Sequence, residues 1–408
     1  MCLVVRYFRN RHAKLNGGVK VFKEQTRKWI WYATVWVVLL IVGITPVIGA
    51  TPTKSPYKIG AVFAITGPAS PLGTPERDTA IMLEKQINAK GGIDGHPVQI
   101  IIRDTKSKET DTVLAVKELI EQGVVAIVGP SQTGESLALL DTVTREGIPL
   151  VSCAAGIKIV QPVNKWVFKT AQSDVHAVSK LIDYMKAKRI KKVAMISVAN
   201  AFGESGKQQL EIQAKKAGIA VVAEETFGDK DTDMTAQLTR IKAKKPQAVV
   251  CWGTNPGPAI VAKNMKQLGM KMPLLMSHGI ANKKFIELAG SAADGVIFPA
   301  GRLIVVDEIP NTDPQKPVLL NYRKSFRAQF ARDPDTFGGH AWDAIQLVVR
   351  ALDKVGPDKA KIRDCIENTK RFVGIGGVFN FSPSEHNGLT KDAFVMVTIQ
   401  NGKWHLIK

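Results

Sequence analysis

Residues 124–141 have the sequence VVAIVGPSQTGESLALLD, in which an apolar strand ends in a loop rich in Gly, Ser and Thr and continues into a helix. The first turn of a helix has backbone N–H groups without intrahelical acceptors and carries the positive end of the helix dipole. A carboxylate or a phosphate binds well at such a junction. The stretch therefore predicts an α/β fold with an anion site in the loop after a strand.

The alternation of strands and helices continues along most of the chain. Repeated strand and helix units with short turns imply parallel sheets covered by helices on both faces. One sheet of this length would be too wide, so we expect two doubly wound, Rossmann-like lobes. The expected strands are residues 58–66, 97–105, 124–129, 193–198, 219–227, 248–253, 273–278 and 295–300. The expected helices are residues 74–92, 111–123, 177–188, 206–217, 233–244, 257–268 and 282–288.

The last hundred residues have a different pattern. Helices are expected at 318–330, 340–355 and 359–369, and the tail after residue 376 alternates like antiparallel strands. Asn387-Gly388 and Asn401-Gly402 supply turn chemistry. Ligands of open α/β sheets bind beyond the carboxyl ends of the strands, so the loops there are the place to search for a site.

The N-terminal segment predicts export. Residues 29–50 contain no charge and follow Lys20, Lys23, Arg27 and Lys28. A cleaved signal peptide is one interpretation, with residues 1–50 as leader and 51–56 as a polar linker. An uncleaved membrane anchor is the other, because 22 uncharged residues could span a bilayer. Both place the rest of the chain outside the cytoplasm.

Charge and composition exclude several classes of protein. The net charge is +20, but the lysines are spread along helices and no aromatic residues interleave with them, which favours solvated helix faces and no nucleic-acid partner. The seven histidines form no HxxxH or HExxH pair, so we predict no metal and no cofactor. Cys153, Cys251 and Cys365 lack metal spacing and allow at most one disulfide, and Cys251 has the surroundings of a core residue.

The GPSQTGES loop, residues 129–136, resembles a phosphate-binding P-loop but has Glu135 where that motif needs Lys. A nucleotide is therefore not expected, whereas a smaller anion can still use Ser131, Thr133 and the backbone amides. The alternative is that Ser131 or Thr133 only caps the helix. GIGG at 374–377 is interpreted as a turn or a bulge.

Catalytic motifs are missing from the sequence. There is no GxSxG elbow, and Asp174 with His176 is the one acid/base pair, although a helix N-cap explains Asp174 more simply. This favours a binding protein over an enzyme.

Five segments resemble the type I periplasmic solute-binding proteins, the group that includes the Leu/Ile/Val-binding protein of ABC importers. They are KIGAVFAITGPASPLG at 58–73, INAKGGIDGHPVQIIIRD at 87–104, GPSQTGES at 129–136, EGIPLVSCAA at 146–155 and FGGHAWDAIQLV at 337–348. The resemblance implies two lobes joined by three crossovers that close over a ligand. Lobe one would comprise residues 55–171 and 302–371, and lobe two residues 172–301 and 372–408.

The resemblance also implies site residues. Thr133, Ala154 and Gly156 match positions that hold the ligand α-carboxylate, although Gly156 stands where the family often has Thr. In lobe two, Phe202 stands where amino-acid binders carry Tyr, and His278 stands where an acidic residue pairs with the ligand ammonium. A desolvated ammonium without a countercharge is costly, so an organic or aromatic acid is favoured over an aliphatic amino acid. The expected ligand-binding residues are Leu72, Ser131, Thr133, Ala154, Gly156, Phe202, Thr254 and His278.

Three functions follow from this resemblance and from the residues. The first is a monomeric, periplasmic or extracytoplasmic receptor that binds a small carboxylate and delivers it to the membrane permease of an ABC transporter. The second is a sensory receptor subunit with the same fold. The third is an exported α/β enzyme, for which His278, Asp174 and His176 are the candidate residues. Trp252 is either an apolar wall of the cleft or a core residue.

Overall fold

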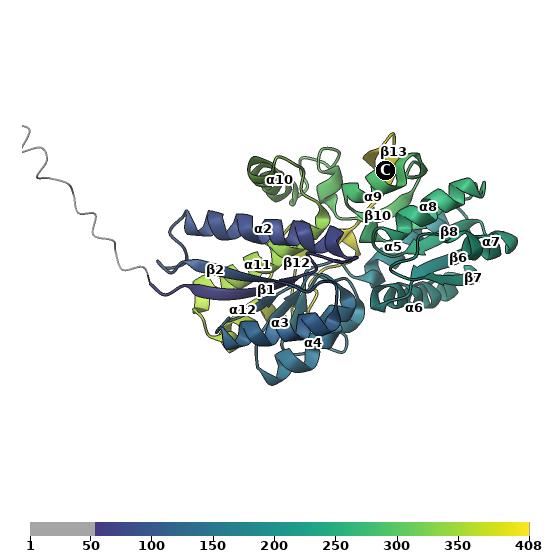
Figure 1. Ribbon diagram of the computed structural model, residues 1–408. Helices are drawn as coiled ribbons and strands as arrows, with labels where there is room; N and C mark the ends of the chain where they lie inside the picture. Colours follow the sequence, from purple (N-terminus) through teal and green to yellow (C-terminus); the bar gives the residue numbers. More distant parts are fainter. Residues whose placement is uncertain (1–53, 408) are drawn as a thin grey trace, which may run out of the picture. The chain divides into compact units, whose positions relative to one another are not determined.

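The computed structural model describes residues 54–407, which form two α/β lobes (Figure 1). The predicted signal or anchor segment, residues 1–50, lies outside the described residues. Among residues 54–407, none of the helices combines the length and the apolar character that a membrane span requires.

The first sheet has five parallel strands in the order β2-β1-β3-β4-β5. They are β1 (Tyr57–Phe63), β2 (Val98–Asp104), β3 (Ile127–Val128), β4 (Leu150–Ser152) and β5 (Val167–Lys169). Side chains of β1 are buried on both faces of the sheet, as is typical of a parallel strand covered on both sides. Phe63 contributes to the core with α2 (Ser70–Asn88), and Val62 to the core with α3 (Glu109–Glu121) and α4 (Thr133–Arg145).

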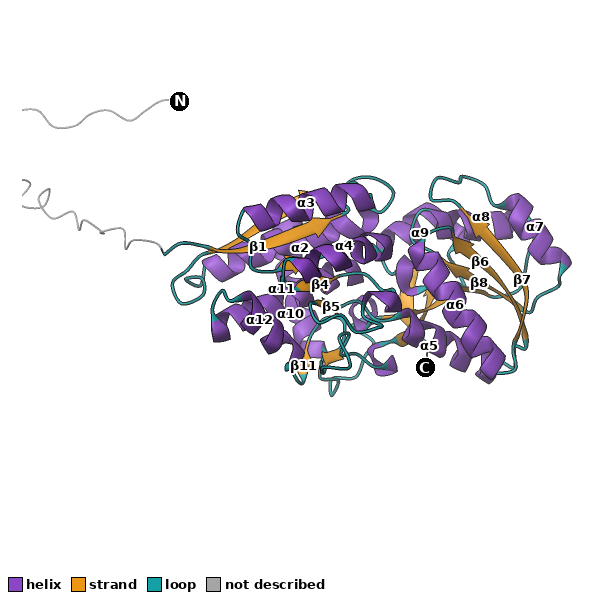
Figure 2. Cartoon of the chain, turned by 90° about the horizontal axis from the view of Figure 1, so that it is seen from below, coloured by secondary structure: helices purple, strands orange, loops and turns teal. Residues whose placement is uncertain are grey.

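The second sheet has seven strands in the order β14-β13-β10-β9-β8-β6-β7. The five parallel strands are β6 (Lys192–Val198), β7 (Ala220–Phe227), β8 (Ala248–Trp252), β9 (Leu274–Met276) and β10 (Ile297–Ala300). The helices of this part are α5 (Asp174–Ala187), α6 (Ala201–Lys216), α7 (Thr235–Ala243), α8 (Gly257–Gln267) and α9 (Lys283–Ala289). Figure 2 shows helices on both sides of this sheet. Two helix-covered sheets, each built around five parallel strands, confirm the predicted fold class.

The chain passes between the lobes three times. It leaves the first sheet after β5, and returns after β10 to form α10 (Lys316–Phe330), α11 (Thr336–Val355) and α12 (Lys359–Glu367), of which α11 packs against α2. The final pass adds β13 (Val395–Gln400) and β14 (Lys403–Leu406), which pair antiparallel to the second sheet and to each other. Asn401 and Gly402 have φ values of 50° and 68° in the intervening turn, so the expected antiparallel tail is confirmed.

Several helices begin earlier than the sequence pattern predicts, among them α2 at Ser70 where residue 74 was expected and α5 at Asp174 where residue 177 was expected. The helix expected at 206 begins at Ala201, and the helix expected at 340 begins at Thr336. Glycines in these first turns lower helix propensity and hide the start. The packing leaves no room for a side chain at these positions, because a Cβ at Gly203 would lie 1.8 Å from the Val198 carbonyl oxygen and one at Gly339 would lie 2.5 Å from Ile375 Cγ2. The correction places Phe202 in the opening turn of α6.

Residues 372–387 belong with the first lobe, whereas the predicted division put everything after residue 371 in lobe two. The short strands β11 (Phe372–Val373) and β12 (Val378–Phe379) form a hairpin whose turn is the GIGG segment, as predicted. Both carboxylate oxygens of Asp343 in α11 accept amides of this turn, from Ile375 and Gly376 at 2.6 Å. Burial of Phe381 against Phe168 of β5 supplies the apolar part of the attachment.

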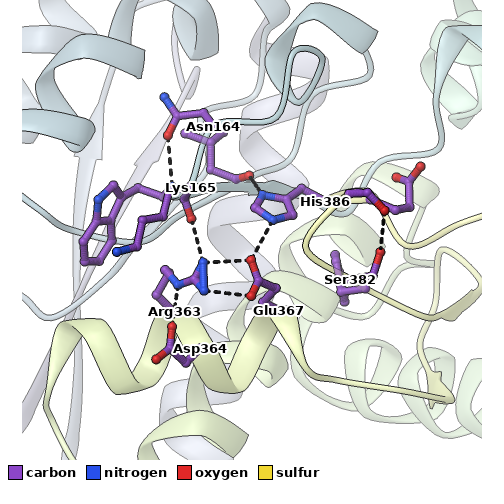
Figure 3. Close-up of polar contacts among 12 residues, drawn as sticks. Asn164, Lys165, Arg363, Asp364, Glu367, Ser382 and His386 are labelled. Carbon is purple, nitrogen blue, oxygen red and sulfur yellow. Dashed lines mark hydrogen bonds and ion pairs between the residues drawn. The ribbon is translucent and has the colours of Figure 1, made fainter.

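A buried polar cluster completes this attachment (Figure 3). His386 Nδ1 is 2.8 Å from the carbonyl of Val167 and its Nε2 is 3.2 Å from Glu367 Oε1. Arg363 donates to both carboxylate oxygens of Glu367 at 2.8 Å. The cluster ties α12 and the loop around His386 to β5, so the chain joins the second sheet only at β13.

The cysteines of the described residues are all free, and Cys251 is fully buried in the core of the second lobe, as expected.

Candidate functional site

A cavity of about 380 Å³ lies where loops from both lobes meet, at the carboxyl ends of the strands. Its size falls in the range of small-molecule pockets. The first lobe contributes the loops after β2, β3 and β4, and the second lobe contributes those after β6, β7, β8 and β9. The position agrees with the rule for ligand sites in open α/β sheets.

Seven of the eight residues predicted to bind the ligand line this cavity. They are Leu72, Ser131, Thr133, Ala154, Phe202, Thr254 and His278. Gly156 is not among the lining residues; its amide donates to Thr133 Oγ1 at 3.2 Å. A Cβ at position 156 would lie 2.3 Å from Thr133 Cγ2. Gly156 therefore holds Thr133 in place rather than facing the cavity.

The helix-cap interpretation of Ser131 and Thr133 is wrong. The residue before the first turn of α4 is Gln132, and its amide donates to Glu135 Oε2 at 3.2 Å. Ser131 Oγ instead accepts the amide of Ala64 at 3.0 Å. The hydroxyl oxygens of Ser131 and Thr133 each accept an amide from a neighbouring loop, and both residues line the cavity.

Glu135 is held within its own loop. Its carboxyl group is buried and accepts the hydroxyl of Thr105 at 2.6 Å as well as the Gln132 amide. Burial raises the pKa of Glu135 to about 7. The side chain is engaged with its own loop, where a P-loop would direct a lysine at phosphates.

Several helices begin at the cavity wall. The lining residues in first turns come from α2 (Leu72), α3 (Glu109 and Thr110), α4 (Thr133 and Gly134), α6 (Ala201 and Phe202) and α11 (Phe337). The side chain of Asn200 caps α6 by accepting the amides of Phe202 at 3.0 Å and Gly203 at 3.2 Å. Convergent N-termini produce a positive potential that favours an anionic guest.

The wall from the second lobe is aromatic. The rings of Phe202 and His278 are 5.7 Å apart and nearly perpendicular. Trp252 stands behind both, 5.8 Å from Phe202 and 6.0 Å from His278, and has no exposed surface. Of the two roles considered for Trp252, the structure assigns core packing.

Two buried imidazoles line the cavity. Burial lowers the pKa of both His278 and His340 to about 3, so both rings are neutral at physiological pH. Within residues 54–407, both ring nitrogens of His278 lack a hydrogen-bond partner, and so does Nδ1 of His340. A neutral imidazole offers one donor and one acceptor, which a bound ligand can satisfy.

Charged residues at the cavity are Lys108, Glu109 and Asp229 in addition to Glu135. Lys108, Glu109 and Asp229 are exposed, and Asp229 accepts the Asn200 side-chain amide at 3.1 Å. Phe202 and His278 of the second lobe and His340 of α11 are uncharged, whereas Asp229 follows β7 of the second lobe.

The residues proposed for an enzyme do not assemble. Asp174 is buried in the first turn of α5, and burial raises its pKa to about 6. The N-cap residue of α5 is Ser173, not Asp174. Of His278, Asp174 and His176, only His278 lines the cavity. Residues 54–407 contain no cluster of three metal-ligating side chains.

Sequence reasoning missed Phe337 and His340 of α11 and the residues at the start of α3 as cavity residues. The segment FGGHAWDAIQLV was identified as a family motif, but nothing in its pattern indicates that its first turn meets loops some two hundred residues earlier in the chain.

The fold and the cavity define a class of protein, and the comparison with known families identifies it. A periplasmic binding protein family model matches residues 56–403, and the chain belongs to this family.

Individual relatives are distant. The Leu/Ile/Val-binding protein homolog 3 of Brucella melitensis is 23% identical over 349 residues, 85% of this chain and 92% of its own. The leucine-, isoleucine-, valine-, threonine- and alanine-binding protein of Pseudomonas aeruginosa is 23% identical, over 76% of this chain and 81% of its own. An extracellular ligand-binding receptor from Rhodopseudomonas palustris HaA2 superposes with a TM-score of 0.82 at 28% identity, over 87% of this chain and all of that receptor. The substrate-binding protein LivJ of Streptococcus pneumoniae, in complex with isoleucine, has a TM-score of 0.77 at 26% identity, over 86% of this chain and 99% of LivJ.

Proposed function

We propose that this protein is an extracytoplasmic solute-binding receptor of an ABC importer that closes its two lobes over a small carboxylate and delivers it to a membrane permease. The observation that supports the proposal is the cavity between the lobes, where helix N-termini converge beside a neutral aromatic wall. The branched-chain amino-acid binding proteins among the relatives support the transport role.

The carboxylate of the ligand belongs at the start of α4. Thr133 and the backbone amides of the opening turn are the candidate donors. Ala154 after β4 also lines the cavity, but its amide donates to Ser152 Oγ at 3.1 Å. The first helical N–H groups have no intrahelical acceptors, so a ligand carboxylate supplies what they lack. Ser131 stands beside them in the same loop.

The ligand that this cavity favours is an organic or aromatic acid rather than an aliphatic amino acid. An ammonium group taken out of water needs a carboxylate partner, and position 278 supplies a neutral imidazole. Glu135 is engaged with its own loop, and Glu109 and Asp229 are exposed. Phe202 and Phe337 offer contact to an apolar or aromatic body, and His278 offers a hydrogen bond to a further oxygen.

Lobe closure supplies the transport signal. Two hydrogen bonds join the lobes beside the cavity. The side-chain amide of Asn282 donates to the carbonyl oxygen of Pro71 at 3.0 Å, and the Thr336 hydroxyl donates to the carbonyl oxygen of Ala281 at 3.2 Å. A ligand that touches both lobes binds the closed form more tightly than the open form and shifts the population toward it. The closed form is then the state that the permease recognises.

A thermal-shift panel tests the ligand class. The protein is melted with benzoate, hydrocinnamate and succinate, and in parallel with L-leucine, L-isoleucine and L-valine. We expect a rise in melting temperature with at least one amine-free acid. Stabilisation by leucine or valine, with no response to aromatic or dicarboxylic acids, would falsify the preference for organic acids.

A further inference from the structure

A buried carboxyl group lies directly behind Ser131. Glu76 of α2 has no exposed surface, and its Oε2 is hydrogen-bonded to the Ser131 hydroxyl. The same hydroxyl accepts the amide of Ala64 at 3.0 Å and lines the cavity. Glu76 Oε1 has no hydrogen-bond partner within residues 54–407.

The protonation state of Glu76 decides what Ser131 offers to a ligand. A serine hydroxyl has one proton and two acceptor lone pairs, and the Ala64 amide uses one lone pair. If Glu76 is ionised, it only accepts, so the Ser131 proton points at Glu76 and the cavity meets a lone pair. If Glu76 is protonated, its own O–H donates to the second lone pair, and the Ser131 proton is free to point into the cavity.

The surroundings of Glu76 favour the protonated form. Burial raises the pKa of Glu76 well above its usual value, the Ser131 hydrogen bond opposes this, and the nearby carboxyls of Glu135 and Asp335 raise it further. Glu135 belongs to α4, and Asp335 precedes α11. The buried thiol of Cys153 after β4 is also close enough for a charge on Glu76 to raise its pKa. The groups that face Glu76 are thus acids, a thiol and the Ser131 hydroxyl.

We propose that Glu76 is a positioning residue that keeps its proton at neutral pH and thereby makes Ser131 a hydrogen-bond donor to the ligand carboxylate. The inference rests on the proposed carboxylate function of this cavity. Ionised Glu76 disfavours a bound carboxylate for two reasons. It takes the Ser131 proton that would otherwise be donated to the ligand, and its negative charge repels the negative charge of the ligand. Binding therefore requires the proton, and affinity falls about tenfold for each pH unit above the point where Glu76 ionises.

Two variants separate the roles of Glu76 and Ser131. Glu76→Gln keeps a donor to Ser131 and cannot ionise, so we expect affinity close to wild type near pH 7 and no decrease at higher pH. Ser131→Ala removes the donor, and we expect a loss of at least about tenfold, the lower end of the range for a hydrogen bond to a charged group. Glu84→Gln, the same change elsewhere in α2, is the matched control and should behave like wild type. Titration calorimetry with hydrocinnamate and L-leucine as probes gives the affinities.

A measurement without ligand tests the proton itself. Infrared difference spectra of wild type against Glu76→Gln near neutral pH should show the carbonyl stretch of a protonated carboxyl group. A carboxylate band in its place, or an affinity of Glu76→Gln as low as that of Ser131→Ala, overturns the proposal. If neither probe binds wild type, the carboxylate function fails, and the infrared band alone still decides whether Glu76 keeps its proton.

Discussion

Three of the cavity-lining side chains carry the proposed function: Thr133, Phe202 and His278. Thr133 is held by the Gly156 amide and stands in the first turn of α4, where an anion is favoured. Phe202 and His278 form an uncharged aromatic wall, and the proposed preference for an amine-free acid rests on it. The residue types were readable from the sequence, but the packing of Gly156 against Thr133 was not, because it depends on how closely two loops approach.

Glu135 gives a prediction about pH. Its folded-state pKa of about 7 lies above the usual 4.5, so the folded protein binds this proton more tightly than the unfolded chain. That contribution to stability is complete below about pH 4.5 and is lost as pH rises through about 7. Glu135→Gln cannot ionise, so its melting temperature should fall less than that of wild type between about pH 5 and pH 8.

The control for this prediction is Glu121→Gln, an exposed carboxyl at the end of α3. Its melting curve should follow wild type at both pH values. Parallel decreases for wild type and Glu135→Gln would show that Glu135 ionises as readily in the folded protein as in the unfolded chain.

At the scale of elements, strand and helix order followed from the sequence, and the exact helix starts did not. Periodicity identified α6 and α11, but their first turns contain glycines that the pattern excludes and that tertiary packing requires. Those hidden first turns carry Phe202 and Phe337 into the cavity. The hairpin of β11 and β12 was placed in the wrong lobe because its anchors, Asp343 and Phe168, are distant in sequence.

The buried cluster of Figure 3 predicts how strongly this hairpin region is attached. Glu367→Ala leaves the guanidinium of Arg363 and the ring of His386 without their shared partner, and both are buried. We expect a loss of about 3 kcal/mol in the free energy of unfolding, the usual cost of breaking a buried ion pair. Urea denaturation measures it.

Asp364→Ala is the matched control, since Asp364 also pairs with Arg363 but from an exposed position. Asp364→Ala should lower the free energy of unfolding by less than about 1 kcal/mol. Equal losses in the two variants would mean that burial adds nothing to the Glu367 interaction.

At the scale of the whole molecule, the cavity exists only because two lobes bring their strand ends together. The order of the sequence motifs predicted this architecture and seven of its lining residues. His340 and Phe337 were missed because the chain returns to lobe one only after completing the parallel strands of the second sheet. Function therefore depends on contacts between segments that no local pattern relates.

The central claim is that this cavity binds a carboxylate and rejects an ammonium group. Titration calorimetry with matched ligands tests it directly: hydrocinnamate is phenylalanine without its amino group, and isocaproate is leucine without its amino group. The account predicts that at least one amine-free acid binds about tenfold or more tightly than its amino-acid counterpart, since an unpaired buried ammonium costs at least that much. Tighter binding of L-phenylalanine and L-leucine than of both amine-free acids would contradict it.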